Sequence, residues 1–476
     1  MVVGAGITGL AAAHRLHELS RERGHRVALC LLEERGRLGG NIRTERVDGV
    51  LMEGGPDQFV HHKPSGLALC RRLGLDGEVI EIDARQTAAH VVRRGRPVRL
   101  PVGFSLMGPS QLMSLASSPF VSWRGLLRAA CEPWIPPRPA GVEDESLSSF
   151  FTRRFGRELH DHVFEPILGG IFTADTERLS LEMTAPQLLR LEREHGSIVK
   201  ALRRRASAKT PARPERAPRG ACVSLRGGLG RLIDRLAERI PEDCARTGVR
   251  VESVRPDEGP GRWRVSTGEG ELVADAVILA CPGFVSARLL SWNPGLNEDL
   301  RRLEYASCAT VNLVYPETAF SQPLDNFGFF VGRTEGQPIL ACSHVSVKYP
   351  ERVPQGRVLL RAFLGGARDP GVVDLADEGL VRLAHRSVAG LLKIEGNPLF
   401  ARVHRFPSSM PQFAVGYRRH RDAIVERSRR HPGLFPCGGV LGTIGLPDCI
   451  ESGESAALEA LAYLQAKQPR QSVAAS

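Results

Sequence analysis

Three glycines at the start of the chain, Gly4, Gly6 and Gly9, form the pattern G-x-G-x-x-G, which can cradle the diphosphate of a dinucleotide. Such a turn needs a strand before it and a helix behind it, so that backbone amides face the phosphates. The apolar run 25–36 ends in acids, and Glu33 lies 24 residues after Gly9, close to where an acid binds a ribose hydroxyl. This order predicts a dinucleotide site, and a plain glycine turn with a surface glutamate is the alternative.

A second group of glycines follows at a spacing that favours a flavin over a nicotinamide cofactor. The segment RLGGNIRT spans residues 37–44, and MEGGPDQF spans residues 52–59. Paired glycines let backbone amides approach a diphosphate without a Cβ clash, and Arg37 can add a charge-assisted contact. A nicotinamide dehydrogenase usually runs from its acid into another helix and strand. The pattern is therefore typical of flavoproteins with a two-part FAD fold, and two ordinary turns are the alternative.

A third glycine turn lies near the C-terminus, in the segment GGVLGTIGLPDC (438–449). A long helix is expected to begin near Asp448, with Pro447 suited to its first turn. Its unpaired amides and positive dipole end would face whatever fills the turn, and Gly445 leaves room for a ring. In a flavoprotein this end can face the N1–C2=O edge of the isoalloxazine, where charge accumulates on reduction. An ordinary capped surface helix is the alternative.

The two elements that flank the first glycine turn are not equally well predicted by the sequence. Behind it, Ala11, Ala12, Ala13 and Leu16 predict a helix with an apolar face, but before it stand only residues 1–3. That is roughly half of the five or six residues expected of a strand. A central strand pairs on both sides, so missing residues would remove hydrogen bonds and apolar burial. We therefore expect the natural start to lie upstream, with Met1 an internal residue of the strand.

The rest of the chain alternates between helical and α/β character. Helical patterns dominate residues 96–202, a turn and helix return near Gly227, and short β-like runs prevail from 309 to about 364. These patterns predict an α/β protein with α+β insertions, whose nucleotide-binding domain is assembled from separated segments. The expected segments are 1–85, 221–285 and 401–476 for the cofactor-binding domain, 86–205 for a helical domain facing the substrate or a membrane, 206–220 for a mobile basic loop, and 286–400 for a mixed-sheet substrate domain.

Composition narrows the class of protein. The chain has 64 Lys and Arg against 53 Asp and Glu, and the net charge of +11 suits nucleic acid, an anionic membrane face or an acidic small molecule. Residues 203–220 hold seven cations, one acid and three prolines, which predicts a solvated loop, and no aromatic residue is interleaved to stack on bases. We therefore expect no nucleic-acid partner.

Cysteine spacing and hydropathy add expectations about the compartment. The ten cysteines form no C-x-x-C pattern, which argues against zinc and favours reduced thiols. No apolar run approaches the ~18 residues of a membrane span. No secretory leader precedes the glycine turn, so we expect a cytoplasmic protein. Peripheral contact with the inner face of a membrane stays open, as does the oligomeric state.

Taken together, the motifs resemble the FAD-dependent porphyrinogen oxidases of haem biosynthesis, which comprise the protoporphyrinogen and coproporphyrinogen III oxidases. The resemblance covers nearly the whole chain, and its most specific part is residues 165–198, because related amine oxidases and carotene desaturases carry nothing similar there. It implies a two-part, Rossmann-like FAD-binding domain of the amine-oxidase type. The supporting segments include GAGITGLAAAHRL, EERGRLGGNIRT, EPILGGIFTADTERLSLEMTAPQLLRLEREHGSI, LRGGLGRLIDRL, NFGFFVG, LLRAFLGGARDP, SMPQFAVGY and GLPDCIESG.

The resemblance also implies which residues bind each ligand. No acid or base in the matching motifs is an evident catalytic group, so no catalytic side chain is named, and no metal is expected. From the sequence alone, the three phenylalanines assigned to the substrate are ordinary core residues. The implied FAD contacts are Gly4, Ala5, Gly6, Ile7, Thr8, Gly9, Glu33, Glu34, Arg37, Gly40, Asn41, Gly55, Pro56, Asp57, Gln58, Val251, Phe406, Ile444, Gly445 and Leu446, and the implied substrate contacts are Gly170, Phe327, Phe330 and Phe363.

The implied activity is the oxygen-dependent, six-electron oxidation of a porphyrinogen to a porphyrin, with hydrogen peroxide as the second product. Ala89 stands where mitochondrial-type protoporphyrinogen oxidases have an arginine that binds a propionate. Residues 441–443 also depart from the aromatic–Glu–Gly that relatives commonly have there. The sequence is more similar to coproporphyrinogen oxidases of the Gram-positive type, so we predict coproporphyrinogen III as the substrate and keep protoporphyrinogen IX as the alternative.

Two other classes of function remain as rivals. One is a different FAD oxidase, acting on amines or polyenes, although no aromatic cage for an amine is evident. The other is a non-catalytic basic protein that uses the fold to bind nucleic acid or a membrane. Flavin colour in the purified protein separates the first class from the second.

Overall fold

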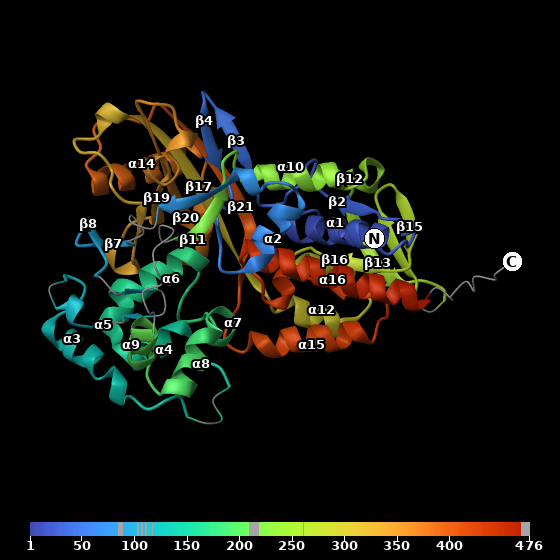
Figure 1. The fold of residues 1–476 in the computed structure, drawn as a ribbon, viewed down its shortest axis with the longest axis horizontal. Coiled ribbons are helices and arrows are strands. Elements are labelled where there is room, and N and C mark those ends of the chain that lie inside the picture. Colours follow the sequence, from blue (N-terminus) through green and yellow to red (C-terminus); the bar gives the residue numbers. More distant parts are fainter. Residues whose placement is uncertain are drawn as a thin grey trace.

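The computed structural model describes residues 1–83, 89–101, 104–105, 108–109, 112–116, 118–139, 141, 143–208, 219–259 and 261–467. The molecule is elongated, with two halves that differ in architecture. One half holds a parallel sheet between two layers of helices, at the right in Figure 1. The other half holds a mixed sheet next to a helical module, at the left in the same view.

A five-stranded parallel sheet carries the N-terminal glycine turn. Its order is β12–β2–β1–β16–β22, so β1 (Val2–Val3) pairs on both sides. Val2 lies opposite Leu31 on one neighbour and Ile278 on the other. The glycine turn thus follows a central parallel strand, which confirms the predicted class of fold. The other strands are β12 (Ala245–Thr247), β2 (Leu31–Glu33), β16 (Val277–Leu279) and β22 (Leu434–Pro436).

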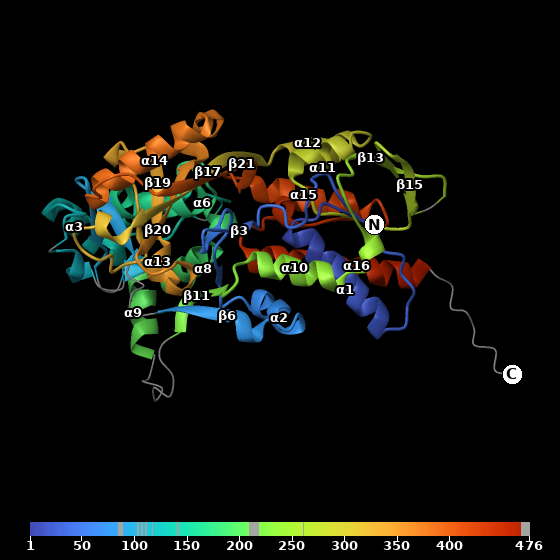
Figure 2. The ribbon, with the colours of Figure 1, turned by 90° about the horizontal axis from the view of Figure 1, so that it is seen from above.

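Each face of this sheet buries its own layer of helices. Val2 packs in the cluster beneath one face, whereas Val3 packs in the cluster on the other, because successive strand residues point to opposite faces. Figure 2 shows the two layers edge-on. The first comprises α1 (Ile7–Glu22), α2 (Pro64–Arg72), α10 (Gly230–Arg239) and α16 (Leu446–Lys467), and the second comprises α11 (Gly283–Leu289), α12 (Pro294–Arg301) and α15 (Tyr417–Arg429).

Three small antiparallel units surround the parallel sheet. The hairpin of β3 (Thr44–Val47) and β4 (Val50–Glu53) reaches from the parallel sheet to the mixed sheet. A second unit is β13 (Val251–Pro256), β14 (Trp263–Thr267) and β15 (Gly270–Ala274), and a third has the order β5 (Phe59–Val60), β11 (Arg219–Leu225) and β6 (Val79–Asp83).

A seven-stranded mixed sheet forms the second half. Its order is β21–β17–β20–β19–β18–β7–β8, and α14 (Asp377–Leu392) buries one of its faces through Leu380, Ala384 and Val388. The other face is turned toward the helical module and the β3–β4 hairpin. The strands are β21 (Phe400–Gln412), β17 (Glu304–Pro316), β20 (Arg357–Gly365), β19 (Ile339–His344), β18 (Gly328–Phe330), β7 (His90–Arg93) and β8 (Arg96–Arg99), and the short α13 (Val345–Lys348) follows β19.

The helical module packs around an aromatic core that includes Phe150, Phe151 and Phe164. Among the described residues, no helix is both long enough and apolar enough to cross a bilayer. The module contains α3 (Trp123–Ala130), α4 (Leu147–Phe155), α5 (Arg157–Leu159), α6 (Glu165–Phe172), α7 (Leu181–Thr184), α8 (Pro186–His195) and α9 (Ile198–Ala208), beside a short pair of β9 (Phe104–Ser105) and β10 (Gly108–Pro109).

The basic segment 203–220 joins the helical module to β11. Helix α9 continues to Ala208, so the first residues of the segment are helical rather than loop, and β11 begins at Arg219. The middle of the expected mobile loop, residues 209–218, lies outside the described residues.

Candidate active site

The N-terminal glycine turn has the geometry of a phosphate-binding turn. Gly4 has a φ of +96°, which favours glycine. Helix α1 makes its first internal bond from the Leu10 amide to Gly6 O, so the amides of residues 7–9 have no partner within the helix. A Cβ on Gly9 would lie 1.8 Å from Gly4 O, whereas a Cβ on Gly6 would meet nothing within 4 Å. Gly9 therefore serves close packing, and Gly6 faces open space.

Glu33 ends β2 directly beside this turn. Its Oε2 accepts a hydrogen bond from the Ala5 amide at 2.7 Å, and its Oε1 accepts one from the Arg35 amide at 2.9 Å. Glu34 lies on the exposed side, 3.5 Å from Arg250 Nε. The segment leading to Val251 runs alongside, because the Val249 amide donates to Glu33 O at 2.9 Å. The structure thus brings the predicted ribose-side and adenine-side residues together.

The two internal glycine segments also meet at the turn. Arg37 donates to Gly40 O at 2.6 Å and to Ile42 O at 3.1 Å, so its guanidinium fixes the shape of the loop. A Cβ on Gly40 would lie 2.9 Å from Gly6 Cα, and a Cβ on Gly55 would lie 1.8 Å from Asn41 O. Only glycine allows these two approaches.

The C-terminal turn closes the same region. Helix α16 begins at Leu446, two residues before the predicted start near Asp448. Pro447 lies in its first turn, as predicted. Lys63 Nζ lies 2.6 Å from Asp448 Oδ1, and a Cβ on Gly453 would lie 2.1 Å from Thr8 O, so α16 is held against the start of α1. Ile444 packs against the cluster on the other face of the parallel sheet.

These features fit FAD. A cradle of open backbone amides, glycines that a Cβ would fill, and an acid at the end of the second strand are the groups that a dinucleotide requires. Residues 4–9, 37–41 and 55–58 would hold the diphosphate and the ribityl side, and the first turn of α16 would face the flavin.

The face of the mixed sheet opposite α14 places substrate candidates in rows. Phe363 lies opposite Ala341, which lies opposite Phe330, so both half-buried rings project from one face. Gly170 of α6 covers this row, and a Cβ on it would lie 2.6 Å from Phe330 Cδ1. Phe406 projects from the same face, since it pairs with Cys308, which pairs with Gly365.

Two other residues are placed differently from this row. Phe327 precedes β18 and packs against a different hydrophobic cluster, the one that includes Val50, Met52 and Ile82. Ala89 precedes β7 and packs, like Phe330, against the core of the helical module.

A buried polar cluster lies beside this face and joins the predicted Asp57 to Arg361, which was not predicted as a site residue. Arg361 is 3% exposed and donates to Gly54 O at 3.0 Å and to Gly55 O, and its guanidinium lies 4.7 Å from the centre of the Phe363 ring. Burial would raise the pKa of the Asp57 carboxyl, but Lys348 and Arg361 hold it below its ordinary value. Burial raises the pKa of Glu53. Arg361 meets the cofactor-side segment through its bonds to Gly54 O and Gly55 O, and it meets Phe363 on the same strand.

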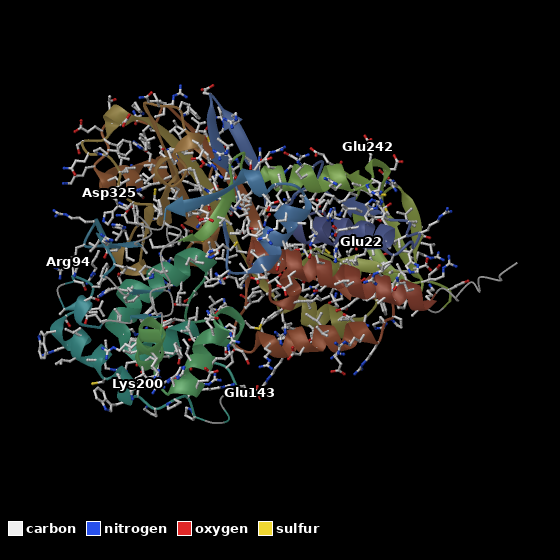
Figure 3. The ribbon with its side chains drawn as sticks, viewed as in Figure 1. Glu22, Arg94, Glu143, Lys200, Glu242 and Asp325 are labelled. Carbon is white, nitrogen blue, oxygen red and sulfur yellow. The ribbon has the colours of Figure 1, made fainter. Side chains whose placement is uncertain are left out.

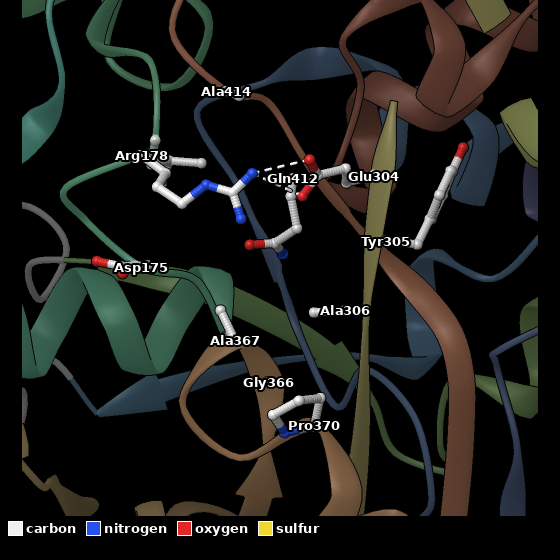
Figure 4. Close-up of a pocket in the computed structure, with 11 residues that line it drawn as sticks. Asp175, Arg178, Glu304, Tyr305, Ala306, Gly366, Ala367, Pro370, Gln412 and Ala414 are labelled. Atoms are coloured by element: carbon white, nitrogen blue, oxygen red, sulfur yellow. Dashed lines mark hydrogen bonds and ion pairs between the residues drawn. The ribbon is translucent and has the colours of Figure 1, made fainter. Parts of the chain in front are cut away.

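A separate pocket of about 240 Å³ opens where β17 and β21 meet the α6–α7 connection. Arg178 and Glu304 form an ion pair at 2.8 Å across it, and Gln412 lies beside them (Figure 4). None of the residues predicted from the sequence lines this pocket, and its volume is below the roughly 300–1,000 Å³ of most ligand pockets. We do not assign it to the macrocycle.

Comparisons with known proteins agree with this geometry. The profile of the family described as flavin containing amine oxidoreductase matches residues 7–461. Coproporphyrinogen III oxidase of Bacillus subtilis (strain 168) is 30% identical, over 98% of each chain. Chloroplastic protoporphyrinogen oxidase of Nicotiana tabacum is 29% identical, over 98% of this chain and 85% of its own. A crystal structure of a protein from Exiguobacterium sp. 255-15 superposes with a TM-score of 0.84 at 26% identity, covering 98% of both chains.

Proposed function

The chain belongs to the flavin-containing amine oxidoreductase family, and on that premise we propose that it oxidises coproporphyrinogen III to coproporphyrin III. It is an FAD-dependent oxidoreductase. The observation that supports a tetrapyrrole macrocycle as substrate is the row of Phe330 and Phe363 beneath Gly170, and the uncharged Ala89 favours coproporphyrinogen III over protoporphyrinogen IX. Full-length similarity to the Bacillus subtilis enzyme supports the same choice.

When bound, FAD would be the acceptor for the two hydrogens that leave the porphyrinogen in each of three rounds of oxidation. The amides of the glycine turn bind its diphosphate, and Arg37 keeps the adjoining loop in shape. The rings of Phe330 and Phe363 would orient the macrocycle by packing against its apolar pyrrole rings. Gly170 keeps α6 close above Phe330, so that the two elements exclude water from the reacting face. Dioxygen accepts the electrons and leaves as hydrogen peroxide.

The test compares two substrates. FAD-loaded protein is supplied with coproporphyrinogen III or protoporphyrinogen IX, and the porphyrin that forms is followed by fluorescence. We expect kcat/KM to be at least about tenfold higher for coproporphyrinogen III, the margin expected when a carboxylate-binding group is left unpaired. A higher value for protoporphyrinogen IX would establish the alternative substrate. Turnover of amines with neither porphyrinogen oxidised would favour an amine oxidase.

We also propose that the protein contacts an anionic membrane surface through α3. Trp123 is 68% exposed and Leu127 is 58% exposed, and residues four apart share one face of a helix. Trp134, 79% exposed, follows in the next turn. Arg124 lies 5.2 Å from the Trp123 ring, and the exposed Lys200, labelled in Figure 3, donates to Pro133 O. Exposed indoles flanked by cations are typical of interfacial segments.

A further inference from the structure

The polar end of the substrate-facing sheet surface holds hydrogen-bonding groups that lack partners. Arg361 and Ser343 lie directly opposite each other on β20 and β19, so their side chains project from the same face. They are 3% and 6% exposed. Within the described residues, Arg361 Nε and Nη1 and Ser343 Oγ have no hydrogen-bond partner. Burying such groups costs free energy unless another group forms hydrogen bonds with them.

Their position relates them to the predicted macrocycle wall. Arg361 and Phe363 are two residues apart on β20, and Ser343 and Ala341 are two apart on β19. Residues two apart project from one face at a spacing of about 7 Å. A flat ligand against Phe330 and Phe363 would therefore have the unpartnered groups at its edge.

Charge balance indicates the kind of group that fits. Three buried or half-buried cations, Lys348, Arg352 and Arg361, lie around two acids. Lys348 Nζ lies 3.6 Å from Asp57 Oδ2, and Arg361 Nη1 lies 3.8 Å from Asp57 Oδ1, too far for a hydrogen bond. Arg352 turns Nη2 away to Ser224 and Leu225, at 2.7 Å each. The cluster keeps an excess of positive charge, which favours an anion as its missing partner.

We propose that Arg361 and Ser343 form a subsite for one propionate carboxylate of the porphyrinogen, an inference that rests on the proposed function. Nε and Nη1 of Arg361 each present an unpartnered N–H that a carboxylate can accept, while its Nη2 stays on the carbonyls of Gly54 and Gly55. One side chain thereby joins the cofactor turn to the substrate. The cation that Ala89 does not supply is provided by Arg361 from another strand of the same sheet.

The experiment measures binding of the product to the FAD-loaded protein. Coproporphyrin III and its tetramethyl ester are titrated in the same detergent-containing buffer, and the dissociation constants are compared. Variants are Arg361→Lys, which keeps the charge but loses the Nε and Nη1 donors, and Ser343→Ala, which leaves the Gly54 and Gly55 contacts intact. Arg357→Gln is the matched control, because Arg357 is on the same strand but contacts Asp48 O at an exposed site.

We expect Arg361→Lys and Ser343→Ala to weaken binding of the acid by roughly ten- to hundredfold and several-fold respectively, with binding of the ester unchanged. The control should alter neither. Equal losses for acid and ester, or no loss for either variant, would overturn the subsite. If Arg361→Lys releases FAD, Ser343→Ala decides alone. Failure of the wild type to bind coproporphyrin III or oxidise its porphyrinogen would count against the proposed function instead.

Discussion

At the scale of single residues, Gly6 and Gly9 belong to one motif but have different roles, one in cofactor binding and the other in packing. A side chain at Gly6 would enter open space where phosphate binds, whereas one at Gly9 would meet Gly4 O at 1.8 Å. We expect Gly6→Val to fold with the thermal stability of the flavin-free wild type and to retain less than about a tenth of its FAD. Gly9→Val should lower the free energy of unfolding by about 3 kcal/mol or more through overpacking.

Flavin absorbance after heat release and apo-protein melting curves measure the two effects. Full FAD occupancy in Gly6→Val would contradict the assignment of the turn to the cofactor. Equal melting of both apo variants would contradict the separation of roles.

His344 makes stability depend on pH. It is fully buried on β19, its Nδ1 lies 2.9 Å from Asn326 O, and burial lowers its pKa to about 4. The unfolded chain binds a proton near pH 6.5, so the folded state is penalised as pH falls from about 6.5 to 4. We expect this group to remove about 2 kcal/mol of stability between pH 7.5 and 5.

The measurement is the free energy of unfolding at the two pH values for the wild type and His344→Gln. The variant should lose stability on acidification by about 2 kcal/mol less than the wild type. His14, whose pKa burial also lowers to about 4, stays in both proteins and cancels from the comparison. Identical pH profiles for the two proteins would refute the assignment.

At the scale of elements, one ion pair fixes α6 over the substrate face. Glu165 Oε1 lies 2.6 Å from Arg368 Nη2, and Arg368 Nη1 donates to Val331 O at 2.7 Å just beyond β18. Both side chains are about a tenth exposed. Removing one partner of such a pair leaves a buried charge uncompensated. We expect Glu165→Gln to cost about 3 kcal/mol and to raise KM, because Gly170 loses its position over Phe330.

The control is Glu298→Gln, which breaks the exposed pair with Arg302 and should change stability by less than about 0.5 kcal/mol. Urea unfolding and steady-state kinetics on coproporphyrinogen III give the two readouts. A double variant of Glu165 and Arg368 that loses the sum of the single losses would show that the two side chains are not coupled.

Local patterns predicted the elements that local physics determines. The glycine turn, the strand ending at Glu33 and the helix containing Pro447 each depend on neighbours within a few residues, and they lie where their motifs indicate. The row of Phe330 and Phe363 depends on the register of three strands, which is set by packing over long sequence separations. Arg361 was missed for the same reason, and so was the pairing of β7 with β18. The family resemblance, not periodicity, identified the phenylalanines.

At the scale of the whole molecule, charge and apolar surface are distributed so that one end can meet a membrane. The chain carries a net charge of +11, and α3, with the exposed Trp123 and Leu127, lies at the far end of the helical module (Figure 1). The β13–β15 unit lies at the opposite end, and its Val273 is 51% exposed. Two indoles offer about 150–250 Å² each, so burying half of that area contributes about 5 kcal/mol. Cations add an attraction to anionic lipid that salt screens over about 10 Å at 0.1 M.

We therefore expect the protein to cosediment with vesicles containing about a third phosphatidylglycerol, and less so as salt rises from roughly 0.05 to 0.5 M, since the Debye length falls more than threefold. The double variant Trp123→Ser/Trp134→Ser should lower the vesicle partition coefficient by at least about tenfold. It removes the apolar part of the contact but none of the charge. Val273→Ser removes exposed apolar surface at the other end and should bind like the wild type. Unchanged binding in the double variant would place the contact elsewhere on the molecule, and binding that is insensitive to salt would exclude an electrostatic contribution.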